Sequence, residues 1–203
     1  MPQNFTQFAF TSSVKEAQEH YGSRKSYERM EQDPDRFILT DRETSYIPTL
    51  DFFFMATAGE NGWPYVQFRG GPKGFLKILD ERTLGFADFR GNRQYISVGN
   101  INSGHNVALI LLDFAHRVRL KIWATATVQD PAENPDLTTK LADPGYDAKI
   151  ERLITLTVQA YDWNCPQHIT PRYTEEEIRE NPSRFFPEEI LDDHNNLVGN
   201  HRH

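Results

Sequence analysis

The feature that most constrains this fold is the regular alternation of apolar and polar side chains over residues 117–128. Leu120 and Ile122 share one face with four further apolar residues, while Arg119 and Lys121 lie on the other face. Because successive side chains in a strand point to opposite faces, this pattern predicts a long strand with one buried face. Any fold for the chain must therefore include a sheet built around this strand.

Several other segments have strand-like patterns, and short turn signals such as Glu60-Asn61-Gly62 and Gly70-Gly71-Pro72 separate them. The predicted strands cover residues 51–58, 64–69, 74–79, 83–88, 105–112 and 154–160. The first four are spaced as a meander of antiparallel strands. Six or so strands with few intervening helices predict a mainly β fold, a small barrel or a strongly curled antiparallel sheet. No glycine-rich strand-to-helix fingerprint of the dinucleotide-binding type supports an α/β fold.

Helices are expected mainly at the two ends of the chain. Ser13 with Glu16, and Thr40 with Glu43, have the spacing of a capping box, and Asn92 is placed to cap a short helix over residues 92–102. Further helices are predicted over 134–143 and 174–180. We therefore expect a helical N-terminal arm over residues 1–48, a barrel domain over 49–170, and a polar C-terminal helix and tail over 171–203.

Composition excludes several classes of protein. A single cysteine, Cys165, rules out an intramolecular disulfide and multi-cysteine metal sites. No apolar run is long enough for a membrane helix and no leader is recognisable, so we expect a cytoplasmic protein without a membrane partner. The net charge of −7 argues against nucleic acid as a partner. The apolar fraction of 38% is low, which suggests that the core is completed by a partner chain.

The acidic total conceals a basic region over residues 64–125, which holds 9 basic and 4 acidic side chains. On its strands, Gln67 and Arg69 share one face, and so do Arg119 and Lys121. If these faces line one groove, they form a positive floor suited to phosphate or to a polar ring system. The alternative interpretation is that each polar face is simply solvated.

The turn after the strand 83–88 carries a second signal for an anion. Asn92, Arg93 and Gln94 lie at a predicted helix start, where free N–H groups and the helix dipole favour a phosphate monoester. The alternative is an ordinary turn in which Asn92 caps the helix and Arg93 is solvated.

Near the end of the chain, Cys165 has no neighbouring base except His168. We therefore expect Cys165 to have a packing role rather than to act as a nucleophile.

Taken together, seven blocks of sequence resemble the FMN-binding branch of the pyridoxamine 5'-phosphate oxidase family. They are DFFFMATA (51–58), GWPYVQFRGGPKGF (62–75), LGFAD (84–88), GNRQYIS (91–97), GN (99–100), RLKI (119–122) and WNCPQH (163–168). The resemblance spans about residues 40–175 and implies a six-stranded antiparallel split β-barrel with flanking helices, a homodimer, and FMN bound at the subunit interface. It places the cofactor contacts at Gln67, Phe68, Arg69, Lys73, Phe75, Ala87, Asp88, Asn92, Arg93, Gln94, Arg119, Trp163, Asn164, Cys165 and Gln167.

Two departures limit what the resemblance implies about activity. The phosphate turn Asn92-Arg93-Gln94 has one cation fewer than the oxidases proper, and the histidine and arginine pattern that holds their substrate has no match here. The expectation is an FMN-dependent oxidoreductase of unknown substrate, with NAD(P)H or a small redox molecule as partner, and with no catalytic or metal-binding residue identified. The alternative is a flavin-binding carrier, sensor or redox buffer without turnover. A third interpretation is that the groove takes haem or a deazaflavin.

Overall fold

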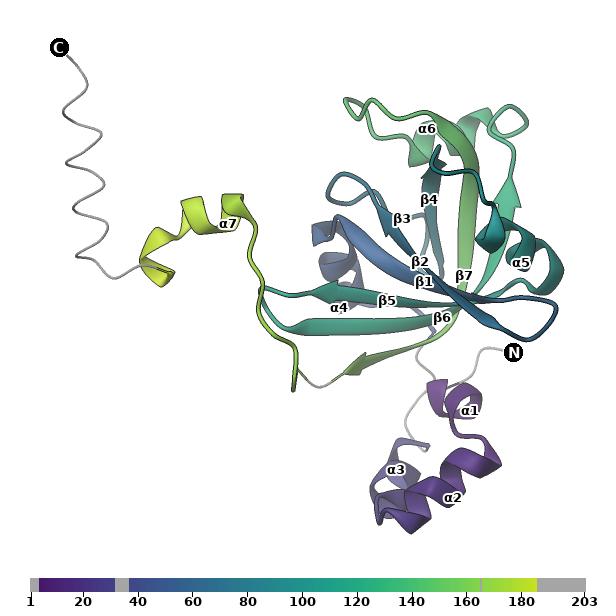
Figure 1. Ribbon diagram of the computed structural model, residues 1–203, viewed down its shortest axis with the longest axis vertical. Helices are drawn as coiled ribbons and strands as arrows, with labels where there is room; N and C mark the ends of the chain where they lie inside the picture. The colour runs from purple at the N-terminus through teal and green to yellow at the C-terminus, as the bar shows by residue number, and fades with distance from the viewer. Residues whose placement is uncertain (1–3, 32–36, 165, 186–203) are drawn as a thin grey trace. The chain divides into compact units, whose positions relative to one another are not determined.

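The computed structural model describes residues 4–31, 37–164 and 166–185 (Figure 1). Its contacts divide the chain into two units, one comprising residues 1–113 and 118–165 and the other comprising 114–117 and 166–203. The first unit contains the sheet and the N-terminal helices. The second contains the helix α7 (Glu175–Glu180) and the short 3₁₀ turn η2 (Pro182–Arg184). Within the described residues, no helix is long and apolar enough to cross a membrane.

The fold is mainly an antiparallel sheet with flanking helices. Seven strands are joined in the order β2-β1-β5-β6-β7-β4-β3 (Figure 1). Their bounds are β1 Phe52–Ala58, β2 Pro64–Gly70, β3 Lys77–Ile78, β4 Thr83–Phe89, β5 Asn106–Asp113, β6 Val118–Gln129 and β7 Ile150–Asn164. The sheet is open, and its curled form is consistent with the split barrel that the sequence predicts.

One detail of the expected sheet is wrong. The sheet has seven strands, as many as the segments with a strand pattern and one more than the resemblance implies, but β2 and β3 lie at opposite edges instead of forming a meander. The physical reason is that β5, β6 and β7 insert between the two hairpins, with β5 paired to β1 and β7 paired to β4. The loop that follows β2 therefore carries the chain to the far edge of the sheet.

The core lies on the inner face of the curled sheet. Phe53 stacks on Phe75 at 5.5 Å between ring centroids and meets the edge of Phe86 at 5.3 Å. On β6, Leu120 and Ile122 are fully buried, as the alternation predicts. A fully buried aliphatic side chain of this kind contributes about 1.5–3 kcal/mol to folding.

The N-terminal helices are α1 (Phe5–Ala9), α2 (Ser12–His20), α3 (Arg24–Met30) and α4 (Asp41–Tyr46), and α4 continues into the 3₁₀ turn η1 (Ile47–Thr49). The capping box of Thr40 and Glu43 is present at the start of α4, as predicted. The box expected at Ser13 is wrong, because α2 begins two residues earlier and Thr11 caps it with its hydroxyl. Phe5 stacks on Trp123 of β6 at 5.9 Å, so α1 packs on the sheet of its own chain.

Two helices lie between strands. They are α5 (Ile96–Gly104), between β4 and β5, and α6 (Pro135–Leu141), between β6 and β7. The expected start of α5 at Asn92 is wrong. Asn92 instead accepts a hydrogen bond from the Gln94 N–H at 3.1 Å, and the left-handed residue Tyr95 (φ 56°) precedes the helix. A local turn therefore replaces the predicted first turn of the helix.

Candidate functional site

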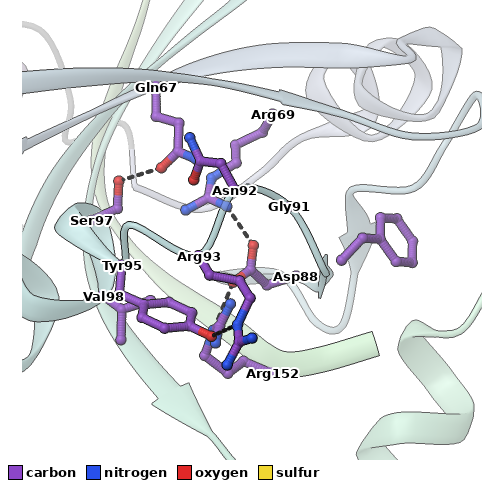
Figure 2. A pocket seen from close by; sticks show the side chains of 11 residues that line it. Gln67, Arg69, Asp88, Gly91, Asn92, Arg93, Tyr95, Ser97, Val98 and Arg152 are labelled. Carbon is purple, nitrogen blue, oxygen red and sulfur yellow. Dashed lines mark hydrogen bonds and ion pairs between the residues drawn. The ribbon is translucent and has the colours of Figure 1, made fainter. Parts of the chain in front are cut away.

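A polar pocket of about 190 Å³ lies where β2, β4 and β7 approach the first turn of α5. Figure 2 shows its side chains, which come from segments far apart in the sequence. The lining consists of Gln67, Arg69, Asp88, Phe89, Gly91, Asn92, Arg93, Tyr95, Ser97, Val98 and Arg152. Three of these side chains are guanidinium groups and one is a carboxylate, so the pocket carries net positive charge.

The carboxylate of Asp88 organises the floor of the pocket. It is only 4% exposed, and both Arg69 and Arg152 form ion pairs with it (Figure 2). Arg152 lies opposite Asp88 in the β4–β7 register and donates from Nε to Oδ2 at 2.8 Å. Arg69 reaches Asp88 from β2. One buried carboxylate thus holds two arginine side chains in fixed positions, which prepares them to meet a ligand.

The Arg69 side chain is itself largely buried, and this affects its electrostatics. Burial lowers the pKa of its guanidinium, while the charge of Asp88 opposes that change. Arginine remains protonated in proteins under such conditions. Its Nε is buried and has no hydrogen-bond partner among the described residues. An unsatisfied donor in the wall of a cationic pocket fits the oxygen of an anionic ligand.

The turn over residues 91–95 forms the other side of the pocket. Arg93 and Tyr95 both adopt left-handed backbone conformations, with φ values of 62° and 56°. This conformation costs free energy in residues with bulky side chains, so surrounding contacts must maintain it. The Arg93 Nε donates to the Tyr95 hydroxyl at 3.0 Å, and the Arg152 guanidinium lies 4.7 Å from the centroid of the Tyr95 ring. Arg93 is thereby directed along the pocket while remaining exposed.

The helix α5 is attached to the sheet beside this turn. Ser97, which is buried, donates its hydroxyl to Gln67 Oε1 at 2.7 Å (Figure 2). The Gln67 side chain lies on the same face of β2 as Arg69, as the period of two predicts. The arrangement can accept a phosphate monoester, because cationic side chains, an amide and the first turn of a helix meet in one pocket.

Five of the residues predicted as cofactor contacts come together here: Gln67, Arg69, Asp88, Asn92 and Arg93. Gln94 is next to the pocket and contributes its backbone N–H to the turn. The other predicted residues between Phe68 and Ala87 lie elsewhere. Phe68 is 58% exposed on the opposite face of β2, whereas Phe75 and Ala87 are buried in the core. Lys73 lines a separate groove with Lys77 and Lys140.

The predicted residues near the end of the barrel form a different group. Arg119 pairs with Asn164 in the β6–β7 register. Trp163 packs against the core and donates its indole N–H to Glu43 of α4. Gln167 is exposed in the second unit, and Cys165 lies outside the described residues.

Six residues that line the pocket were not predicted as contacts, namely Phe89, Gly91, Tyr95, Ser97, Val98 and Arg152. Arg152 was missed because the predicted last strand began at residue 154, whereas β7 begins at Ile150. The adjacent apolar residues Leu153 and Ile154 break the alternating pattern there, so Arg152 carries no strand signal in the sequence. No sequence signal marks the left-handed conformation of Tyr95.

Comparison with known proteins identifies the family. A family model described as pyridoxamine 5'-phosphate oxidase matches residues 39–150, more than half of the chain. The chain belongs to this family. The match includes every residue that lines the pocket except Arg152. A search of curated proteins found no match.

Solved structures of the pyridoxamine 5'-phosphate oxidase family are among those similar to this chain. A putative pyridoxamine 5'-phosphate oxidase from Lactobacillus delbrueckii is 20% identical, with a TM-score of 0.47 over 62% of this chain and 93% of the other. An FMN-binding protein from Syntrophomonas wolfei is 11% identical, with a TM-score of 0.47 over 62% and 88%. A structure described as an F420 reductase is 19% identical, with a TM-score of 0.42 over 61% and 98%.

Proposed function

We propose that this member of the family is an FMN-binding flavoprotein oxidoreductase, with the phosphate of FMN in the pocket around Asp88. The observation that carries the proposal is the set of three arginines, Arg69, Arg93 and Arg152, around one pocket with a single buried carboxylate. A phosphate monoester carries a charge of about −1.5 to −2 at neutral pH. The excess of guanidinium groups in the lining attracts that charge, although Glu151, which pairs with Arg152 at 3.0 Å, offsets part of the excess.

The size of the pocket supports a phosphate site rather than a complete flavin site. Its volume of 190 Å³ is below the roughly 300–1,000 Å³ typical of pockets that enclose a whole small-molecule ligand. The ribityl chain and the isoalloxazine ring would therefore extend from the pocket over another surface. In our proposal, the second subunit of a homodimer provides part of that surface.

The outer face of β1, β2 and β5 suits a second copy of the chain. Val66 and Phe68 are 60% and 58% exposed, and Phe68 stacks on Phe52 at 5.5 Å. Phe54 and the exposed Ile110 are paired across the β1–β5 register and extend this apolar surface. Burying such a face would complete the core of a chain with a low apolar fraction. We propose Arg119 and Asn164 as the residues that reach the flavin of the partner subunit.

When bound, FMN would supply the redox chemistry through its isoalloxazine ring. The chain's own residues would bind and orient it. Arg93 and the two arginines held by Asp88 would fix the phosphate, and Gln67, held by Ser97, would present a fixed amide to the ligand. This positioning requires no acid or base from the protein, so catalytic residues stay unassigned.

The absorbance spectrum of the purified protein tests the proposal directly. We expect flavin bands, or their appearance when FMN is added to cofactor-free protein. A colourless protein that does not take up FMN would refute it, and bands of haem or of a deazaflavin would redirect the cofactor assignment. Anaerobic addition of NADH or NADPH then separates an enzyme from a carrier or sensor. Prompt bleaching supports turnover, and a flavin that no reductant bleaches supports a binding protein.

A further inference from the structure

A second groove lies beside α5 and shares no lining residue with the phosphate pocket. It is formed by the turn between β1 and β2 and by the face of α5 that carries Ile96, Gly99, Asn100 and Ser103. Its volume is about 610 Å³, which is within the range of small-molecule sites. Gly99 adds no side chain, and a Cβ placed there would meet no atom within 4 Å. A flat ligand could therefore approach the backbone of the helix.

An exposed tryptophan forms one wall of this groove. Trp63 is 75% exposed, which is unusual for a large aromatic side chain that has no role in the core. Its backbone is nevertheless fixed. The Trp63 N–H donates to Asn61 Oδ1 at 3.1 Å, and its carbonyl accepts from the Gly59 N–H at 2.9 Å. A rigid turn thus presents an open indole face, which is a surface for stacking a planar ring.

Two amide side chains lie together in the same groove. A Cβ placed on Gly59 would lie 2.9 Å from Asn61 Oδ1 and 3.5 Å from Asn100 Oδ1, so the two side chains converge above this glycine. Asn100 uses Nδ2 to donate to Thr57 Oγ1 at 2.9 Å, and Asn61 uses Oδ1 to accept from Trp63. Asn61 Nδ2 and Asn100 Oδ1 have no hydrogen-bond partner among the described residues. One donor and one acceptor match the carbonyl and the NH₂ of a primary carboxamide.

The charge of the groove restricts the ligand further. Its described lining includes Glu60 and contains no lysine, arginine or histidine. An anionic ligand would meet repulsion from Glu60 and no compensating cation. A neutral ring would meet no such penalty, and a cationic ring would also be attracted to the face of Trp63. The selectivity is therefore opposite to that of the pocket around Asp88.

We propose that this groove is a second binding site, for a neutral or cationic planar heteroaromatic ring that carries a primary carboxamide, as nicotinamide does. The ring stacks on Trp63, and the carboxamide pairs with Asn61 and Asn100. The site goes beyond the proposed flavin function and does not depend on it, because none of these residues lines the phosphate pocket.

Ligand-observed NMR titration of the full-length protein tests the site with three probes that differ in charge. They are nicotinamide, 1-methylnicotinamide and nicotinate. For ligands of this size we expect dissociation constants on the order of millimolar for the first two. Nicotinate should bind at least about tenfold more weakly, because its carboxylate replaces the amide and faces Glu60. Equal binding of nicotinate, or no saturable binding of nicotinamide, would overturn the proposal.

Two variants and two controls locate the binding. Trp63→Ala removes the stacking surface at an exposed position and should weaken nicotinamide binding about tenfold or more. Asn61→Asp keeps the side-chain oxygen that accepts from the Trp63 N–H but removes the Nδ2 donor. This variant should also weaken nicotinamide binding. Tyr21→Ala, which removes another highly exposed aromatic ring, and Arg29→Ala, which removes an exposed arginine from α3, should leave nicotinamide binding unchanged. Unchanged binding in Trp63→Ala, or equal loss in the controls, would place the ligand elsewhere.

Discussion

At the scale of single residues, the phosphate pocket depends on Asp88. This carboxylate is almost fully buried, and it is acceptable there only because two guanidinium groups neutralise it. Its role is structural as well as electrostatic, since it fixes both arginines before any ligand arrives. Removing its charge would leave Arg69 without its ion-pair partner and Arg152 with Glu151 alone, which it contacts at 3.0 Å.

We therefore predict that Asp88→Asn lowers the free energy of unfolding by about 3 kcal/mol, the cost of breaking a largely buried ion pair. Urea denaturation followed by circular dichroism measures this change. Asp147→Asn, at an exposed position, is the matched control and should change stability by less than about 0.5 kcal/mol. Similar values for the two variants would show that Asp88 does not hold the arginines.

Arg93 is the exposed cation of the pocket, so it can be removed with less effect on folding. Arg93→Ala deletes a charge-assisted hydrogen bond worth about 1.5–3 kcal/mol, and FMN affinity should fall about tenfold to a hundredfold. Fluorescence titration of cofactor-free protein with FMN measures it. Arg29→Ala, which removes an exposed arginine from α3, should leave the affinity unchanged. An unaltered affinity in Arg93→Ala would move the phosphate to another site.

Among single residues, the sequence predicted side-chain positions correctly where the two-residue period of a strand applies. The alternation of β2 places Gln67 and Arg69 together, and the structure brings both into the pocket. The turn before α5 was not predictable in the same way. Asn92 can cap a helix or form a local turn with similar hydrogen bonds, and the left-handed conformations of Arg93 and Tyr95 decide between them.

At the scale of elements, α4 is attached to the end of β7 by a buried carboxylate. Glu43 accepts hydrogen bonds from the Trp163 indole, the Thr40 hydroxyl at 2.6 Å and the Thr40 N–H at 2.9 Å. Arg42 lies 4.1 Å from the centroid of the Trp163 ring and covers it. This contact joins two segments 120 residues apart.

The protonation of Glu43 makes this attachment sensitive to acid. Burial opposes the charged form, but the hydrogen bonds from Thr40 and Trp163 outweigh it, so the pKa of Glu43 lies below its ordinary value of 4.5. Stabilisation is complete above the unfolded-state pKa and is lost as the pH falls through the lower, folded-state value. We expect a change in tryptophan emission below about pH 4.5, absent in Glu43→Gln. Glu16→Gln, an exposed control, should retain the transition.

The positions of the strands in the sequence were easier to predict than their order in the sheet. Strand periodicity located β1, β2, β4, β5 and β6 within a few residues. It could not show that β2 and β3 lie at opposite edges, because strand order depends on pairings between distant segments. The strand predicted over residues 74–79 is shortened to the two residues of β3, which pair with β4.

At the scale of the whole molecule, the exposed apolar face of β1, β2 and β5 predicts self-association. Phe68→Glu places a charge at its centre and should shift the protein from dimer to monomer in analytical ultracentrifugation. Because the proposed flavin site is completed across the interface, this variant should also retain less FMN. Tyr21→Glu adds the same charge at an exposed aromatic position on the arm and should remain dimeric. A monomeric unsubstituted protein at micromolar concentration would contradict the proposed interface.

The helix α5 separates the two grooves and is bonded to the sheet under each of them, through Ser97 to Gln67 and through Asn100 to Thr57. Ligands in the two sites would thus act on one short, nine-residue helix. Thermodynamic linkage makes such an effect reciprocal. If FMN changes the affinity for nicotinamide by some factor, nicotinamide must change the affinity for FMN by that same factor. The four dissociation constants, for FMN and for nicotinamide with and without the other ligand, therefore form a closed thermodynamic cycle around α5. Any three of them determine the fourth.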